Sequence, residues 1–367
     1  MTNPLIQLGR LGQSPWYDFI TRQLIESGTL ARLIADDGLL GMTSNPTIFE
    51  KAIASSADYD ADIRRLTAAG LEPAQVFESL AVTDVRAACD AFLAVYQATR
   101  GRDGLVSLEV SPALAHDTTG TIAEAKRLWA AVDRPNAMIK IPGTKAGLPA
   151  IAECVAAGLN INVTLLFAVD RYREVIDAYL TGLERRVKAG LPIKMIASVA
   201  SFFVSRVDSR VDGILDRQGD PEGLRGTIAI ANAATAYRVF DESVAGSRWQ
   251  ALAAKGASSQ RPLWASTSTK DPKYPDVYYV EALVARDTVN TLPPDTFAAY
   301  RDHGNPAVRI DAAIATAGAK LAALEQVGIS LAEVTAFLEQ DGVAKFAASY
   351  QSLLSGIESK MGILATS

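Results

Sequence analysis

The sequence predicts an α/β fold in which parallel strands alternate with crossover helices. Short apolar or alternating runs recur along the chain, and the longer stretches between them have helical periodicity. The 367 residues would suit two domains of ordinary size, but a barrel of alternating strands and helices commonly reaches about 250 residues as one unit. The length therefore also allows one large domain with additions, and no Ser/Gly linker, charge block or repeat marks a domain boundary.

Eight strands are expected. They cover residues 14–19, 39–46, 105–112, 137–144, 160–167, 195–203, 261–268 and 287–292. The connections between them are long enough for helices, which favours parallel over hairpin pairing.

Three of the helical stretches carry specific signals. Thr121 and Glu124 have the spacing of a capping box before residues 125–132, and Ser330 with Glu333 repeats that spacing at the start of a helical tail. The third stretch precedes these two in the chain, and one of its faces consists of Val85, Ala88, Cys89, Phe92, Val95 and Tyr96. In the tail, the apolar residues expected to pack back on the body are Val334, Phe337, Leu338, Val343, Phe346 and Leu353. The tail therefore looks structural, and Cys89 is expected in the core.

Composition limits the possible functions. Hydrophobic residues make up 49% and charged residues 21%, as in a folded chain with an ample core. Acidic residues outnumber Lys plus Arg by 41 to 36, and no basic run is present, so no nucleic-acid partner is expected. Two cysteines and two histidines, Cys89, Cys154, His116 and His303, supply neither a disulfide framework nor a metal centre.

The expected location is the cytoplasm. The first 16 residues contain no apolar run long enough for a signal peptide, and no later segment reaches about 18 uninterrupted apolar residues. The small number of cysteines fits a reducing compartment. No membrane partner is expected.

Lys140 is a charged residue inside an otherwise apolar strand. Its neighbours are Met138, Ile139 and Ile141, and a buried ammonium is costly unless it is paired or deprotonated. A lysine in such a place is a candidate amine nucleophile. A strand-end lysine can equally extend its ammonium to solvent or serve as an ion-pair partner, so position alone leaves both interpretations open.

The predicted strands before and after the Lys140 strand each carry polar residues on one face, so three adjacent strands aim polar groups the same way. Ser107, Glu109 and Ser111 alternate with apolar residues in one strand, and Asn160, Asn162 and Thr164 alternate in another. A solvated antiparallel edge would give the same alternation, but the long helical connections favour a site at the mouth of a barrel.

Further polar residues join this set. Singly each is weak: Asn45 before Pro46 could be only a turn, and Arg206 could be a surface charge. The others are Asp18, Ser201, and Ser266 with Ser268, which are expected on one face of the seventh strand. Residues 143–145 (Gly-Thr-Lys) lack the rest of a phosphate-binding loop, and no GxGxxG follows a strand, which excludes ATP and NAD.

Five segments strongly resemble the transaldolase family, both in their residues and in their order along the chain. The most specific are Ile139-Lys-Ile-Pro-Gly-Thr144 and Gly158-Leu-Asn-Ile-Asn-Val-Thr-Leu-Leu-Phe167. The others are Thr43-Ser-Asn-Pro-Thr47, Ser107-Leu-Glu-Val110 and Ala200-Ser-Phe-Phe-Val-Ser-Arg206, and the match extends from the first strand to the tail. The resemblance implies a (β/α)8 TIM barrel over residues 1–367, in which 294–367 form a C-terminal helical extension.

The resemblance also implies a role for each residue. Lys140 matches the amine that forms the Schiff base, Asp18 the acid/base beside the scissile bond, and Glu109 with Thr164 and a water the proton-transfer group for carbinolamine dehydration and imine hydrolysis. Asn45, Asn162 and Ser201 match groups that hold substrate hydroxyls and the imine region. Arg206 and Ser266 match part of a phosphate site. Where many relatives have an Arg, this chain has Ser268, followed by Lys270.

The implied reaction transfers a dihydroxyacetone unit from sedoheptulose 7-phosphate to glyceraldehyde 3-phosphate, giving erythrose 4-phosphate and fructose 6-phosphate in the pentose phosphate pathway. No cofactor or metal is required, because the protonated imine serves as the electron sink. Two rivals remain: an aldolase that cleaves fructose 6-phosphate, and a sugar-phosphate binding protein without turnover. Such aldolases have Gln in place of Glu109 and are much shorter. A homodimer is possible.

Overall fold

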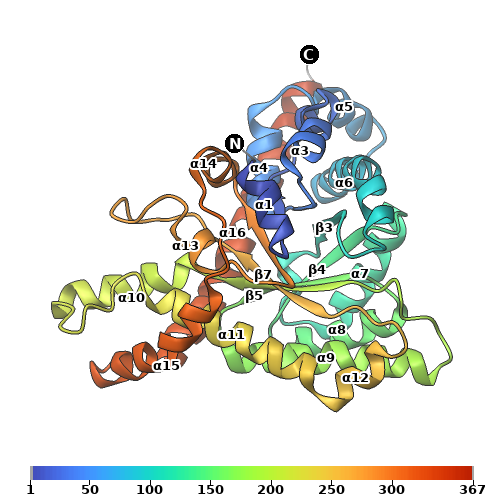
Figure 1. Cartoon of the computed structure of the whole chain (residues 1–367). Coiled ribbons are helices and arrows are strands. Elements are labelled where there is room, and N and C mark those ends of the chain that lie inside the picture. Colours follow the sequence, from blue (N-terminus) through green and yellow to red (C-terminus); the bar gives the residue numbers. More distant parts are fainter. Residues whose placement is uncertain (1–2, 366–367) are drawn as a thin grey trace.

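A closed barrel of eight parallel strands, surrounded by helices, forms the centre of the molecule (Figure 1). The computed structural model describes residues 3–365. The strands follow chain order around the barrel: β1 (Gln13–Asp18), β2 (Gly41–Thr43), β3 (Leu105–Glu109), β4 (Ala137–Pro142), β5 (Ile161–Leu166), β6 (Ser198–Phe203), β7 (Gln260–Ala265) and β8 (Thr288–Leu292). The expected (β/α)8 barrel is confirmed.

Sixteen α-helices and one short 3-10 helix are found in the described residues. They are α1 (Pro4–Arg10), α2 (Arg22–Glu26), α3 (Thr29–Asp37), α4 (Pro46–Ser55), α5 (Asp60–Ala68), α6 (Pro73–Ala98), η1 (Pro112–Leu114), α7 (Thr118–Val132), α8 (Gly147–Ala157), α9 (Val169–Lys188), α10 (Ser205–Gln218), α11 (Ile228–Ala245), α12 (Ser247–Ala253), α13 (Tyr278–Ala282), α14 (Pro294–His303), α15 (Ile310–Gln326) and α16 (Leu331–Ala365). Because the strands are parallel, all their carboxyl ends meet at one end of the barrel.

All eight predicted strands exist, but several end earlier than expected. The second is only three residues long, because Asn45 caps α4 and Pro46 begins that helix. The third ends at Glu109, before Pro112 opens η1. The seventh ends at Ala265. Proline and side-chain capping, which act at single positions, override an apolar run whose length suggests a longer strand.

One predicted helix start is wrong. Asp117, not Thr121, caps α7, and its carboxylate accepts a hydrogen bond from the amide of Gly120. Thr121 lies inside the helix and donates to the carbonyl of Leu114, while Glu124 accepts from the amide of Ser111. A capping-box spacing is a local pattern, and here both members are used in tertiary contacts instead.

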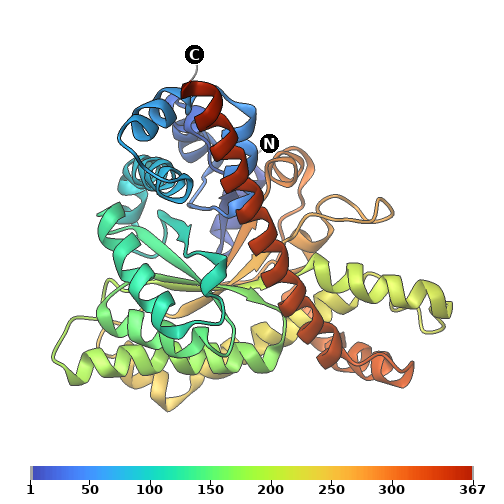
Figure 2. The same ribbon diagram turned by 180° about the vertical axis from the view of Figure 1, so that it is seen from behind.

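Helix α16 runs along one side of the molecule and ends beside the N-terminal helices (Figure 2). It packs against α4, α5 and α6 and touches β5. One of the two bonds of its predicted capping box is present, since the hydroxyl of Ser330 accepts from the amide of Glu333. Val334, Leu338, Phe346 and Leu353 are buried and Val343 is partly buried, as expected. Phe337 is not: its side chain is 43% exposed and lies under the guanidinium of Arg210, 4.1 Å away.

Both cysteines lie in the core. Cys89 and Cys154 are free and fully buried, and burial raises the pKa of each thiol, that of Cys154 to about 12. Cys89 therefore has the core position expected of it. Between residues 3 and 365 no single helix is long and apolar enough to cross a membrane, although α15 and α16, bent by 92°, pass that test as a pair.

Candidate active site

A cavity of about 490 Å³ opens at the carboxyl ends of the strands. All predicted site residues line it except Glu109 and Asn162: they are Asp18, Asn45, Lys140, Thr164, Ser201, Arg206, Ser266 and Lys270. They come from strands β1, β4, β5 and β6, from α10, and from the segments that follow β2 and β7. The barrel closure thus brings together residues that lie as much as 250 positions apart.

Lys140 and Glu109 form a buried ion pair at the base of this cavity. They are register partners on the adjacent strands β4 and β3, so their side chains leave the sheet side by side. The Lys140 Nζ lies 3.3 Å from Glu109 Oε2, and the two side chains are 6% and 5% exposed. The same Nζ donates to the carbonyl of Ser44 at 3.3 Å and lies 5.6 Å from the ring centre of Phe346. Lys140 is therefore both paired and open to the cavity.

Glu109 is held as a weak acid. Burial raises its pKa to about 7, against the lowering influence of Lys140, and Asp18 adds a smaller upward effect. Among residues 3–365 neither of its carboxylate oxygens has a hydrogen-bond partner beyond the ion-pair contact. A buried carboxyl whose pKa lies near 7 can both accept and donate a proton at neutral pH.

Asp18 ends β1 and lines the same cavity. The hydroxyl of Thr43 donates to its Oδ1 at 2.7 Å, and Thr43 in turn lies 2.6 Å from the hydroxyl of Thr291. Burial raises the pKa of Asp18, while Lys140, the Thr43 hydrogen bond and Arg206 oppose the rise. The two carboxyls thus belong to different strands and have different partners.

Asn162 lies beneath the cavity floor. Its amide donates to the hydroxyl of Ser107 at 3.0 Å, and its Oδ1 accepts from the hydroxyl of Ser201 at 2.7 Å. The Asn162 side chain is fully buried, so it holds Ser201 at the cavity wall. Thr164 is also fully buried, and its hydroxyl has no hydrogen-bond partner in the described residues.

Asn160 does not join this polar face. It precedes β5 and its amide donates to the carbonyls of Pro135 and Ala137, each at 2.9 Å. These contacts lie at the start of the strands, at the end of the barrel opposite the cavity. The prediction that Asn160 faces the site is therefore wrong. Asn160 precedes the first residue of β5, so it lies at the end of the barrel away from the cavity even though it continues the alternation of polar residues.

Asn45 has two functions in the structure. Its Oδ1 accepts from the amide of Ile48 at 3.1 Å and so caps α4, which means that Asn45 and Pro46 begin a helix and do not form a simple turn. The same side chain lines the cavity. Helix α4 thereby places Asn45 at the mouth of the barrel, next to Ser44, whose carbonyl accepts from Lys140.

A cluster of cationic and hydroxyl groups lines one wall of the cavity. Ser266 and Ser268 do not alternate on a strand, because β7 ends at Ala265 and Ser266 has a left-handed φ of 55°. The Ser266 hydroxyl lies 3.0 Å from that of Ser205, and the Lys270 Nζ donates to Ser268 at 2.5 Å. Both serines still line the cavity, together with Arg206 and Lys270.

Arg206 is partly unpaired. One of its guanidinium nitrogens, Nη1, is buried and has no hydrogen-bond partner in the part of the chain that the structure describes. The Arg206 guanidinium lies 5.1 Å from the ring centre of Phe203. Burial lowers the pKa of Arg206, and burial followed by the charge of Arg206 lowers the pKa of Lys270. Two cations held close together with a free donor form a site for an anion.

Sequence patterns missed several residues of the site, among them Thr43, Ser44, Thr291 and Phe346. Thr43, Ser44 and Thr291 were not singled out because each lies in an ordinary polar context. Phe346, in the tail, was expected only to pack. No local signal distinguishes it from the other apolar residues of α16, so the tail, expected to be structural, also covers the site.

The chain resembles proteins of known class over its whole length. Residues 15–357 match the model of the family described as Transaldolase/Fructose-6-phosphate aldolase. The chain belongs to this family. A protein of Acidothermus cellulolyticus named Transaldolase is 52% identical over 97% of this chain and 96% of its own length. Transaldolase 1 of Streptomyces coelicolor is 51% identical over 96% and 93%, and Transaldolase 2 of Nostoc sp. is 46% identical over 99% of both.

These matches confirm the resemblance noted in the sequence and the expected enzyme class, a transferase of the transaldolase type. Enzymes of this family act on sugar phosphates, and the cationic wall of the cavity is the place in this chain with matching charge. A sugar-phosphate binding protein without turnover is correspondingly disfavoured.

Proposed function

We propose that this chain transfers a dihydroxyacetone unit from sedoheptulose 7-phosphate to glyceraldehyde 3-phosphate through a Schiff base on Lys140. The products would be erythrose 4-phosphate and fructose 6-phosphate. The observation that carries the proposal is the pairing of a buried lysine, open to a sugar-sized cavity, with a carboxyl whose pKa is about 7. A lysine in that setting can lose its proton to its neighbour and become a nucleophile.

Imine formation would use the ion pair. The Lys140 ammonium gives a proton to Glu109, 3.3 Å away, and the neutral amine attacks the ketose carbonyl. Glu109 then returns its proton to the departing hydroxyl, which leaves as water. Thr164, whose hydroxyl has no partner among residues 3–365, is available to hold that water.

Cleavage would use the other carboxyl. Asp18 removes the proton from the hydroxyl next to the scissile carbon–carbon bond, the bond breaks, and the aldehyde leaves. The electron pair remains as an enamine on Lys140. The enamine attacks the carbonyl carbon of the acceptor, whose oxygen regains the proton from Asp18, and water hydrolyses the new imine.

The substrate would be held at two places. Ser201, supported by Asn162, and Asn45 can bind sugar hydroxyls at the base of the cavity. Arg206, with Ser266 and Lys270, can bind the phosphate, since the free donor of Arg206 and the Lys270 ammonium lie on one wall. Lys270 would supply the charge that Ser268 lacks.

Two measurements test the proposal. Incubation with fructose 6-phosphate followed by borohydride should attach a reduced three-carbon adduct to the peptide that contains Lys140; a label on Lys145 or Lys194 would contradict it. Steady-state assays with donor, and with or without acceptor, separate the rivals. Release of free dihydroxyacetone at the rate of transfer would identify a fructose 6-phosphate aldolase, and no turnover a binding protein.

We also propose a cytoplasmic location and a single domain with residues 294–367 as its extension. Two buried free thiols fit a reducing compartment. The homodimer stays a prediction that the mass in solution, measured by sedimentation, would test.

A further inference from the structure

Phe346 is the point at which the tail helix α16 reaches the substrate cavity. Among the described residues of α16 it alone lines that cavity, and it is only 6% exposed. Its ring centre lies 5.6 Å from Nζ of Lys140, the atom on which the proposed adduct forms. An aromatic ring offers a water molecule almost no hydrogen-bond partner. Water is therefore disfavoured on the side of Lys140 that the ring covers.

A glycine brings α16 close enough to the barrel for this contact. Gly342 is buried one turn before Phe346, on the same face of the helix. A Cβ atom at Gly342 would lie only 3.0 Å from Cδ2 of Leu165 and 3.7 Å from Cε2 of Phe167, so the helix lies nearer to the end of β5 than a larger residue would allow. Glycine destabilises a helix interior relative to alanine, and this close approach explains its presence here.

The strand side of this contact is also irregular. Leu165 directly follows Thr164 and has a left-handed φ of 60°, a conformation that bulky side chains rarely adopt. The pairing of β5 with β6 shifts register between Val163 and Leu166, so β5 bulges around Leu165. Such a conformation costs free energy and persists only where its surroundings hold it. Helix and strand therefore each have an unusual feature at the point where Gly342 meets the barrel.

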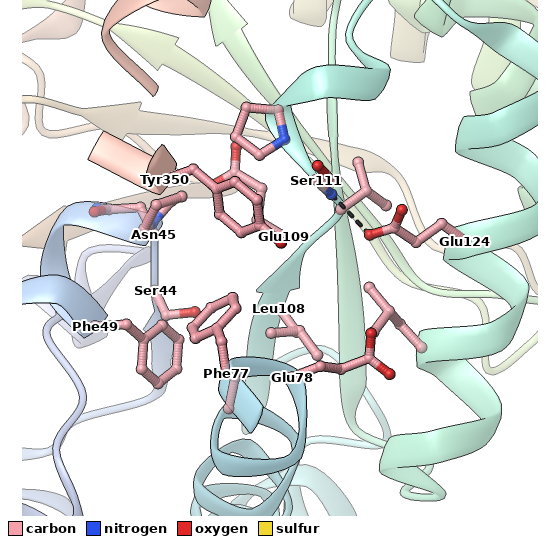
Figure 3. A pocket seen from close by; sticks show the side chains of 15 residues that line it. Ser44, Asn45, Phe49, Phe77, Glu78, Leu108, Glu109, Ser111, Glu124 and Tyr350 are labelled. Carbon is pink, nitrogen blue, oxygen red and sulfur yellow. Dashed lines mark hydrogen bonds between the residues drawn. The ribbon is translucent and has the colours of Figure 1, made fainter. Parts of the chain in front are cut away.

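Further contacts fix α16 one turn beyond this point. The Thr47 hydroxyl of α4 donates to that of Ser349 at 2.9 Å, and the rings of Phe77 in α6 and Tyr350 pack edge to face with their centres 5.8 Å apart. Tyr350 also lines a side cavity of about 30 Å³, and Figure 3 shows it there beside Glu109. That volume has room for about two water molecules. Helix α16 therefore closes this side of the site tightly.

We propose that Phe346 is a specificity-determining residue that excludes water from the enamine on Lys140, and that Gly342 is the positioning residue that sets the ring over the cavity. The proposal rests on the proposed function, in which the three-carbon unit stays on Lys140 between the departure of one aldehyde and the arrival of the next. While water is excluded, the unit passes to the acceptor. Without that exclusion, it is lost as free dihydroxyacetone.

Loss of the unit and its transfer differ in one step. Loss begins when the proton that Asp18 took during cleavage reaches the enamine carbon across a bridging water, which gives a protonated imine. Water then adds to the imine carbon, the carbon–nitrogen bond breaks, and dihydroxyacetone leaves as Lys140 regains its ammonium form. In transfer, the acceptor aldehyde adds to the enamine carbon first, its oxygen takes the same proton from Asp18, and the same hydrolysis follows. The bridging water and the acceptor therefore compete for the enamine.

Two variants open this cover in different ways. Phe346→Ala removes the ring, and Gly342→Leu pushes α16 away from Leu165 without altering a residue that lines the cavity. Fructose 6-phosphate serves as donor and erythrose 4-phosphate as acceptor. The rate of dihydroxyacetone release divided by the rate of transfer should rise about five- to twentyfold in both variants. Borohydride trapping of the Lys140 adduct, measured without acceptor, should stay within about threefold of the parent rate, because imine formation does not use the ring.

Two further variants are matched controls. Gly356→Leu makes the same change on the same helix, where nothing lies within 4 Å of an added Cβ, so its ratio of release to transfer should stay within about twofold of the parent. An equal rise in Gly356→Leu and Gly342→Leu would overturn the role of Gly342. Phe346→Leu keeps an apolar side chain over Lys140 and should raise the ratio less than about threefold, because exclusion of water depends on apolar bulk.

The outcomes against the proposal are distinct. It is wrong if Phe346→Ala and Gly342→Leu melt as the parent does and keep its ratio of release to transfer within twofold. It is also wrong if Phe346→Leu releases as much dihydroxyacetone as Phe346→Ala. If one of the two opening variants unfolds, the other decides. Failure of the proposed function would be seen separately, because borohydride would then leave Lys140 of the parent chain unlabelled.

Discussion

The barrel buries an ion pair at each end, and the two are built differently. At the carboxyl ends of the strands, Lys140 and Glu109 lie 3.3 Å apart, and Glu109 has no other partner in residues 3–365. At the amino ends, Arg261 and Asp103 lie 2.9 Å apart. The Ser14 hydroxyl donates to Asp103 and accepts from Arg261, which closes a ring of hydrogen bonds.

The indole of Trp16 also donates to Asp103, and one guanidinium nitrogen of Arg261 donates to the carbonyl of Arg102. The Arg261–Asp103 pair is thus hydrogen-bonded on all sides, which fixes the positions of its charges and protons. In the Lys140–Glu109 pair, by contrast, the carboxylate of Glu109 has no further hydrogen-bond partner in the described residues, and the pair lies next to a cavity. Buried charge therefore stabilises the fold where its hydrogen bonds are complete, and is available for chemistry where they are not.

Lys140→Met gives the sharpest test of the Lys140–Glu109 pair. Transfer activity should fall on the order of 10⁴-fold or more, because Lys140 is the amine that carries the adduct in the proposed mechanism. The melting temperature should change little, since Glu109 can take up a proton and become neutral once the ammonium is gone. Activity assays and thermal melts measure both. A large loss of stability would mean that the Lys140–Glu109 pair also stabilises the barrel.

Arg261→Met should show the opposite pattern. Asp103 would be left buried with an unmatched charge, and the free energy of unfolding should fall by about 3–5 kcal/mol. Denaturant titration measures this loss. Activity per folded molecule should stay at the parent level, because Arg261 lies at the far end of the barrel. Loss of activity in the folded protein would remove the contrast between the two ends.

The two carboxyls of the mouth should divide the proton transfers. Asp18→Asn should still form the imine but cleave the carbon–carbon bond about 10²-fold more slowly, whereas Glu109→Gln should slow imine formation and release by a similar factor. Release of free dihydroxyacetone should then rise relative to transfer. Borohydride trapping and single-turnover cleavage separate the steps. Equal losses in both steps for both variants would contradict this division.

Glu109→Gln should also change the dependence of stability on pH. The carboxyl has a pKa of about 7 in the folded chain, above its usual 4.5, so the folded state binds its proton more tightly. This contribution to stability is complete below about pH 4 and is lost as the pH rises through 7. The difference in unfolding free energy between parent and variant should therefore shrink or reverse across that interval, by about 1–3 kcal/mol.

The phosphate wall should show an effect on KM alone, and the smallest effect of all is expected at Lys270. Arg206→Ala should raise KM strongly for phosphorylated substrates and much less for unphosphorylated dihydroxyacetone donors. Lys270→Ala should show the same selectivity, with a loss of about two- to fivefold, because Lys270 is an exposed residue. An unchanged KM would remove Lys270 from the site. Equal effects of Arg206→Ala on both substrate types would mean that it shapes the barrel.

The sequence by itself determined the order and type of the strands. Apolar runs with a period of two, separated by stretches with a period of 3.6, are local patterns that need no knowledge of the fold. The same alternation placed Glu109 on a polar face, and the apolar neighbours of Lys140 made that residue conspicuous. With the family motifs, these patterns indicated most of the polar residues that the barrel gathers at its mouth, but not Thr43, Thr291 or Phe346.

Only the tertiary structure decided what each of these residues touches. The ring of Phe346 near Lys140, the side cavity behind Glu109 and the ring of bonds around Arg261 join positions more than 100 residues apart in the chain. Strand ends also escaped the sequence patterns, as at Ser266, where a left-handed backbone replaces the expected alternation. Periodicity records which face a side chain takes, whereas partners and burial, which set the pKa of Glu109, exist only once distant segments have packed together.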